Sequence, residues 1–250
     1  MKTLTKIWIA GAFMLLFTAC DFWNDRDVVD YKVNIGTVEN ADSSSAFYFR
    51  LDNNSLLWVK STNLPNYKPA SGQRIIAEYT LASDKRTGGS YDYDIKLYDA
   101  YSVLTKNVFL VTPSTQDSIG NDYIRVENVW IGADYLNVQF VYAGYDKIHY
   151  INLVSDSSKT YTDGKVHLEF RHNANHDSPI YNRRGYVSFR LKPFSQLLQQ
   201  DTLQLVIHVN SLYGSSAKTY ELKYPVAAGS MDMAAPRKIG MPDGQEKLNR

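Results

Sequence analysis

The chain has 250 residues, with 27 Lys and Arg against 26 Asp and Glu and a formal charge of +1. This near balance gives no electrostatic basis for binding nucleic acid. Cys20 is the only cysteine, which excludes disulfide bonds within the chain and zinc sites built from several cysteines. The length allows one large domain or two ordinary ones.

Residues 1–19 have the features of a signal peptide. Two lysines stand in the first six residues, and residues 7–19 form an uncharged, mostly apolar run. That run is too short for a transmembrane helix, which needs about 20 apolar residues. Residues 16–19 (LFTA) directly before Cys20 resemble a lipobox, although Phe17 stands where leucine is usual. We therefore predict cleavage before Cys20, which then becomes a lipidated N-terminus.

The alternative is an ordinary signal peptide followed by an incidental cysteine. We favour the lipoprotein because the only cysteine falls where a lipobox requires it. Each buried CH₂ of an acyl chain contributes about 0.8 kcal/mol, and two or more chains anchor a protein stably. Cleavage removes two lysines and no acid, which changes the formal charge to −1. We expect a membrane partner through Cys20, and residues 20–30 as a tether.

Between residues 31 and 115, apolar and polar side chains alternate with a period of two. This alternation predicts strands with one buried face. The predicted strands are residues 33–37, 47–51, 56–59, 75–81 and 93–97, and residues 108–111 close the block. Several strands in so short a block, without a helical pattern, predict a domain at 31–115 that is a small β-barrel or a tight sheet.

The polar segment TPSTQDSIGN at 112–121 contains both proline and glycine and is the predicted domain boundary. Beyond it, alternation predicts strands at residues 124–130, 136–142, 147–154, 166–171, 187–191, 203–209 and 220–224. About seven short strands favour a β-sandwich domain at 116–224. Residues 194–200 form the one plausible helical turn. Residues 225–250 lack periodicity, so we predict a disordered tail.

Several of these segments resemble the NigD-like family of proteins. They are QRII at 73–76, YDYDIK at 91–96, DSIGND at 117–122, WIGADYLN at 130–137, KIHYINLV at 147–154, DGKVHLEFRHN at 163–173, RGYVSF at 184–189, LVIHVN at 205–210 and KTYEL at 218–222. The resemblance covers residues 33–224 and is more specific in the second half. It implies an all-β fold, with a small OB-like barrel followed by an immunoglobulin-like β-sandwich.

The resemblance also implies a lipoprotein of the cell envelope, in the outer membrane of a Bacteroides-type Gram-negative bacterium. The family name derives from a proposed role in a bacteriocin locus, as an immunity protein. Residues 225–250 lie outside the resemblance.

One cluster has the composition of a metal site. His167, Glu169 and Arg171 share a strand face, about 6–7 Å apart in succession. His172, His176 and Asp177 follow closely, and imidazole with carboxylate could ligate zinc. However, residues 172–176 have the pattern of a loop, which gives the two histidines no fixed geometry. We favour a solvated sheet face with a polar turn, and predict no metal and no cofactor.

The sequence contains no catalytic motif of the G-x-S-x-G, H-E-x-x-H, Walker or G-x-G-x-x-G kinds. Asp92 and Asp94 share one strand face, but a glycosidase would need such a pair beside a substrate cleft. We favour a solvated edge for them. We therefore predict no catalytic residue and a protein that is not an enzyme.

Two hypotheses of function remain. The first is a lipoprotein that binds a protein partner, such as a toxin in an immunity role. The second is an accessory lipoprotein that binds a glycan or small ligand on the exposed face of the barrel. Outward tyrosines such as Tyr48 and Tyr98 could stack on sugar rings, although exposed tyrosine is also common on sheets. Cys20 is the only residue to which the sequence assigns a chemical role.

Overall fold

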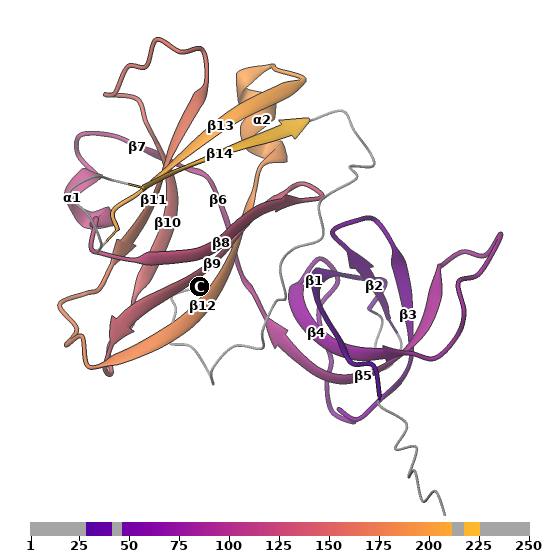
Figure 1. Ribbon diagram of the computed structural model, residues 1–250. Coiled ribbons are helices and arrows are strands. Elements are labelled where there is room, and N and C mark those ends of the chain that lie inside the picture. The colour runs from indigo at the N-terminus through magenta and orange to yellow at the C-terminus, as the bar shows by residue number, and fades with distance from the viewer. Residues whose placement is uncertain (1–28, 42–46, 212–217, 226–250) are drawn as a thin grey trace, which may run out of the picture. The chain divides into compact units, whose positions relative to one another are not determined.

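The computed structural model describes residues 29–41, 47–211 and 218–225. Cys20, the signal peptide at 1–19, most of the tether at 20–30 and all but the first residue of the tail at 225–250 lie outside these residues. The predicted all-β fold, an OB-like barrel followed by a β-sandwich, is confirmed (Figure 1). Among the described helices, none is long and apolar enough to cross a membrane.

The barrel closes in the strand order β1-β2-β3-β5-β4, shown in indigo to magenta in Figure 1. Only β3 and β5 pair in parallel within this barrel. Its strands are β1 (Lys32–Glu39), β2 (Tyr48–Leu51), β3 (Leu56–Thr62), β4 (Arg74–Leu81) and β5 (Tyr93–Ser102). The inward side chains form its core: Val38, Phe47, Phe49, Leu57, Val59, Ile75, Ala77, Tyr79, Ile95 and Leu97.

The sandwich consists of two sheets. The five-stranded sheet has the order β14-β13-β11-β10-β7, and the four-stranded sheet has the order β6-β12-β9-β8. The strands are β6 (Leu104–Asn107), β7 (Phe109–Val111), β8 (Arg125–Gly132), β9 (Tyr135–Gly144), β10 (Tyr150–Asp156), β11 (Val166–Asn173), β12 (Tyr181–Arg190), β13 (Thr202–Val209) and β14 (Lys218–Pro225). The helices are α1 (Gln116–Ile119) and α2 (Lys192–Leu198), the latter near the predicted helical turn.

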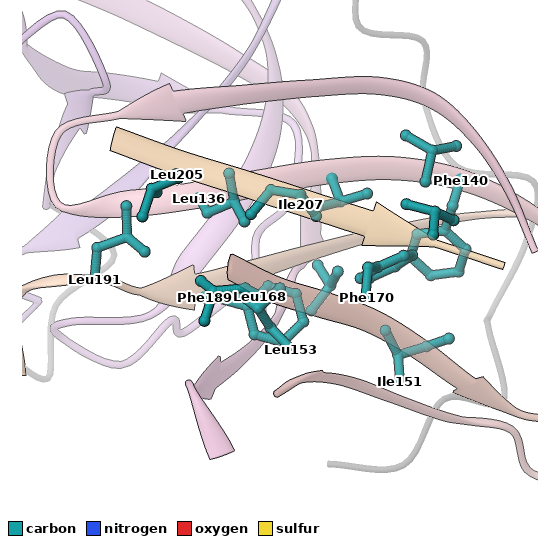
Figure 2. Packing of buried hydrophobic residues seen from close by; sticks show 14 of the residues in the cluster. Leu136, Phe140, Ile151, Leu153, Leu168, Phe170, Phe189, Leu191, Leu205 and Ile207 are labelled. Carbon is teal, nitrogen blue, oxygen red and sulfur yellow. The ribbon is translucent and has the colours of Figure 1, made fainter. Parts of the chain in front are cut away.

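The sandwich core lies between the two sheets, where inward side chains from both sheets meet (Figure 2). Leu136, Phe140 and Phe189 come from the four-stranded sheet, and each is fully buried. The five-stranded sheet contributes Ile151, Leu153, Leu168, Phe170, Leu205 and Ile207. Large apolar side chains alternate with polar ones along these strands, and burial of the apolar face stabilises the stacked sheets.

The predicted boundary between the two domains needs correction. Residues 104–111 were expected in the barrel domain at 31–115, but β6 and β7 pair in parallel with β12 and β10 of the sandwich. The polar segment 112–121 is a loop with α1 inside the sandwich and not a linker. Parallel pairing of strands this short leaves no periodic signal in the sequence, whereas a polar Pro/Gly segment looks the same in a loop and a linker.

Arg74, at the start of β4, links the barrel to the sandwich and is only 1% exposed. Its guanidinium donates to Asp52 Oδ1 at 2.5 Å and to Asp52 Oδ2 at 3.0 Å. It also donates to Asn137 Oδ1 at 2.9 Å and to Ser188 Oγ at 3.4 Å. The guanidinium carbon lies 4.2 Å from the centre of the Tyr135 ring. A buried cation is tolerated because it has a carboxylate and several acceptors.

Two further features join the barrel and the sandwich near Arg74: the backbone at Gly132 lies close to Asp52, and a small apolar cluster has members from both domains. A Cβ on Gly132 would lie 2.1 Å from Asp52 Oδ2, so the β8–β9 turn requires glycine to approach the barrel. The next amide, Ala133 N, donates to the Asp52 carbonyl at 3.1 Å. Both domains contribute to the adjacent apolar cluster, which comprises Ile35, Ile76, Val103, Trp130 and Tyr186.

Replacing Arg74 with alanine would leave the Asp52 carboxylate without its buried cation. We expect a loss of about 3–5 kcal/mol in the free energy of unfolding. Arg50→Ala is the matched control, since the Arg50–Glu39 pair is about one-third exposed on both sides and contributes under about 1 kcal/mol. Urea unfolding followed by tryptophan fluorescence measures both variants. Equal losses would contradict the structural role assigned to Arg74.

Candidate functional site

Three aromatic rings gather on the outer side of the barrel, and we call them, together with Arg86, the aromatic face. Tyr48 on β2 and Trp58 on β3 are paired residues in register, with ring centres 4.7 Å apart. The ring of Tyr91 lies 5.9 Å from Tyr48 and 6.2 Å from Trp58. All three are half-buried. Trp58 points outward because Leu57 and Val59, on either side of it, point into the core.

Charged side chains border the aromatic face. The guanidinium carbon of Arg86 lies 4.6 Å from the Tyr91 ring centre, within range of a cation–π interaction. Arg86 also donates to Asp94 Oδ2 at 2.8 Å, and Lys60 Nζ lies 3.6 Å from the same oxygen. The hydrogen bond from Arg86 holds the pKa of Asp94 below its ordinary value. The result is a preformed aromatic surface with a cation fixed over one ring.

The residues singled out on the barrel have different surroundings. Tyr48 belongs to the aromatic face, whereas Tyr98 packs edge-on against Tyr31 with ring centres 4.9 Å apart. Asp92 accepts a hydrogen bond from Leu56 N at 2.7 Å. Asp94 is 3% exposed and ion-paired, which corrects the expectation that it lies on a solvated edge. The alternation around Trp58 could have identified it, but only the strand register places it beside Tyr48.

The predicted cluster of titratable residues on the sandwich is divided in the structure. His167 contacts His208 and Asp163, whereas His172 contacts His149, a residue that the sequence did not single out. The Arg171 guanidinium lies 2.7 Å from Glu169 Oε2 and is buried. The expectation that this pair lies on a solvated sheet face is therefore wrong. His176 is exposed in the loop. Within the residues that the structure describes, no group of His, Asp and Glu is arranged to hold a metal ion.

One part of the divided cluster, which we call the buried relay, runs from Asp177 through His149 and His172 to the Tyr123 carbonyl. Asp177 Oδ2 lies 3.1 Å from His149 Nε2. His149 Nδ1 lies 2.7 Å from His172 Nε2, and His172 Nδ1 lies 3.0 Å from the Tyr123 oxygen. Both imidazoles are at most 2% exposed, and the Tyr142 ring packs against each.

A second chain, which we call the outer relay, lies on the five-stranded sheet. His167 Nε2 lies 3.0 Å from both carboxylate oxygens of Asp163. His167 Nδ1 lies 2.8 Å from His208 Nε2. Tyr161 stacks on His167 with ring centres 3.6 Å apart and planes inclined by 2°. Register explains the contact between His167 and His208, because β11 and β13 place Glu169 opposite His208, and His167 lies two residues before Glu169 on the same face of the sheet.

Burial and hydrogen bonding shift the protonation of the buried relay in defined directions. Burial lowers the pKa of His172 to about 4 and thereby favours its neutral form. Burial alone would raise the pKa of Asp177. Hydrogen bonds from Tyr145 N and His149 outweigh burial and hold that pKa well below its ordinary value.

Comparison with known proteins gives two consecutive matches to family models. Residues 35–103 match the NigD-like N-terminal OB domain, and residues 107–224 match the NigD-like C-terminal beta sandwich domain. Together these matches cover most of the chain. None of the curated proteins matches this chain significantly.

Solved structures provide further relatives. A protein of unknown function from Bacteroides vulgatus is 29% identical, with a TM-score of 0.68 over 83% of this chain and 97% of that chain. A protein from Parabacteroides distasonis whose description relates it to a toxin is 30% identical, with a TM-score of 0.66 over 79% and 95%. A NigD-like immunity protein from Bacteroides caccae is 20% identical, with a TM-score of 0.60 over 79% and 97%, and shares the fold.

His172 should make folding stability depend on pH. Between about pH 4 and 6.5 the unfolded chain binds a proton at His172 that the folded chain does not, so stability rises with pH. As the pH falls from about 6.5 towards 4, we expect a loss of roughly 2–3 kcal/mol from this residue. Urea unfolding between about pH 5 and 6.5 should give a flatter slope for His172→Gln. His176→Gln, at an exposed position, should keep the slope of the unmodified chain, and identical slopes in all three would contradict the assignment.

Proposed function

This chain belongs to the NigD-like family, and on that premise we propose that it is a non-enzymatic cell-envelope lipoprotein that binds a protein partner. The partner class that we propose is a secreted toxin or bacteriocin, with the chain in an immunity role. Two relatives support this choice, since one is named an immunity protein and the description of another relates it to a toxin.

The observation that carries the proposal is the aromatic face. Tyrosine, tryptophan and arginine are the side chains most enriched among the residues that dominate protein–protein binding energy. Here Tyr48, Trp58 and Tyr91 are packed against one another, and the Arg86–Asp94 ion pair holds the cation over the Tyr91 ring. Because these side chains are already ordered, little conformational entropy is lost when a partner covers them.

A second candidate uses the same face for a glycan. Strands 2 and 3 of OB barrels commonly bind oligosaccharides, and Tyr48 and Trp58 lie on β2 and β3. Flat aromatic rings offer the apolar faces on which sugar rings stack, and the side chains around them supply polar groups. The two candidates therefore differ in partner and not in surface.

For immunity, we expect a deletion strain to become sensitive to a bacteriocin from a sibling strain. The full-length chain should restore resistance, and Trp58→Ala should weaken partner binding by at least about 30-fold, as for a binding hot spot. Tyr181→Ala is the matched control, since Tyr181 is 56% exposed on the sandwich, and this variant should leave protection unchanged. Circular dichroism verifies that both variants fold.

Unchanged killing across a panel of sibling bacteriocins would contradict the immunity role. Saturable binding on a polysaccharide array that Trp58→Ala abolishes and Tyr181→Ala preserves would then favour the glycan candidate. A flat array together with unchanged killing would remove both candidates for this face.

The anchor is proposed at Cys20, which lies outside the residues that the structure describes. We propose that acyl chains on Cys20 hold the protein in the outer membrane. Cys20→Ala should abolish palmitate labelling and move the chain from the membrane fraction to the soluble fraction, because no other residue of the lipobox offers a thiol. Trp58→Ala should remain labelled. Persistent labelling of the Cys20→Ala chain would overturn the proposed lipidation site.

A further inference from the structure

The buried relay has an acceptor at each of its two ends. At one end the Tyr123 carbonyl oxygen faces His172 Nδ1, and at the other the Asp177 carboxylate faces His149 Nε2. Between them the two imidazoles face each other through His149 Nδ1 and His172 Nε2. The three contacts measure 3.0, 3.1 and 2.7 Å, each within hydrogen-bond range.

Counting protons shows that two neutral imidazoles cannot form all three bonds. A carbonyl and a carboxylate only accept, so each of the three hydrogen bonds needs a proton from an imidazole nitrogen. A neutral imidazole carries a single N–H group, and two of them supply two protons. The intact relay therefore needs a third proton, which gives the histidine pair one positive charge.

The surroundings determine where this proton lies. Asp177 accepts from Tyr145 N at 2.6 Å and from Ser178 N at 2.9 Å, which favours the ionised carboxylate. His172 is deeply buried and its Nδ1 donates to the neutral Tyr123 carbonyl, so His172 stays neutral. His149 is the imidazole next to the carboxylate. The third proton of the intact relay is therefore assigned to His149, which would then donate from both ring nitrogens.

We propose that the relay is a proton-operated latch, which holds residues 144–149 against residues 174–178 while His149 carries the third proton. Asp177 joins the two segments, since it follows β11 and binds the Tyr145 and Asp146 amides after β9. Lys147 Nζ adds bonds to the carbonyls of Asn175 and His176, at 3.3 and 2.8 Å.

Loss of the third proton opens the latch for two reasons. One of the three hydrogen bonds disappears, and the Asp177 carboxylate, whose side chain is 2% exposed, loses its counter-charge. The segment that is released presents Tyr145 and Ile148, which are 48% and 46% exposed. Proton binding therefore controls the order of a loop that exposes Tyr145 and Ile148 together with the charged Asp146 and Lys147.

The other charged groups around His149 do not replace this pair. Asp122, before β8, accepts from Ala174 N and lies beside His172. Lys147 is bound to the two loop carbonyls, and the remaining ionisable neighbours in the two segments, Asp146 and His176, are exposed. From β9, the Tyr142 ring packs 4.5 Å from His149. Asp177 is thus the carboxylate in direct contact with the imidazolium.

The outer relay provides a control within the same molecule. His208 Nε2–H can donate to His167 Nδ1, and His167 Nε2–H can donate to Asp163. These bonds need two protons, which two neutral imidazoles supply. Among the described residues, no acceptor is bonded to His208 Nδ1, so the third proton is not required there. The outer relay therefore has the same Asp–His–His arrangement as the buried relay but needs two imidazole protons instead of three.

Nuclear magnetic resonance of the full-length chain, labelled with ¹⁵N-histidine and held in detergent micelles, tests the proposal. Near neutral pH, where free imidazole is mostly neutral, His149 should show both ring nitrogens protonated, and His172 only Nδ1. His167 should show one protonated nitrogen. Assignment uses His149→Gln and His167→Gln. A neutral His149 under these conditions would overturn the proposal.

Asp177→Asn tests the latch separately from the protonation state. The amide can donate to His149 Nε2, so His149 should become neutral and its second ring N–H signal should be lost. The same oxygen of Asp177 accepts from Tyr145 N, so an amide NH2 group turned towards His149 leaves Tyr145 N–H without an acceptor, and hydrogen exchange at Tyr145 should rise at least about tenfold after correction for intrinsic rates. Asp163→Asn, in the outer relay, should leave Tyr145 exchange unchanged. An imidazolium signal that survives in Asp177→Asn, or unchanged Tyr145 exchange, would refute the latch.

Discussion

The buried guanidinium of Arg74 is the interaction on which the joining of the two domains depends. Its removal from water is costly, and the cost is offset by a bidentate carboxylate, Asn137, Ser188 and the ring of Tyr135. The partners come from both domains, so the cation is satisfied only where barrel and sandwich meet. Gly132 belongs to the same constraint, because any Cβ there would collide with the Asp52 carboxylate.

The two candidate functional features arise from opposite uses of strand alternation. On the barrel, inward Leu57 and Val59 leave Trp58 outward beside Tyr48, and a half-buried aromatic surface results. At one end of the sandwich, His149 and His172 pack against the Tyr142 ring and are buried away from water. The first arrangement suits recognition of a partner. The second suits a response to protons, since loss of the third proton costs the buried imidazoles a hydrogen bond.

Much of the fold was predictable because period-two alternation survives wherever one strand face is buried. The strands around Phe49, Ile95, Phe140, Phe170 and Ile207 were recognised in this way. Alternation failed on β4, where Ile76 is buried against the sandwich while Ile75 is buried in the barrel. It also failed for β6 and β7, since a three- or four-residue strand that pairs in parallel has too few positions to show a period.

By itself, the sequence determined the all-β class, the order of barrel and sandwich, the family, and the outward position of Tyr48. These properties follow from local patterns and from residue identity. Tertiary structure alone decided that Arg74 meets Asp52 and Asn137, that His149 meets His172, and that Asp94 is buried. Each of these depends on strand register or loop closure between distant segments, and a one-residue change of register would turn the side chains to the other face.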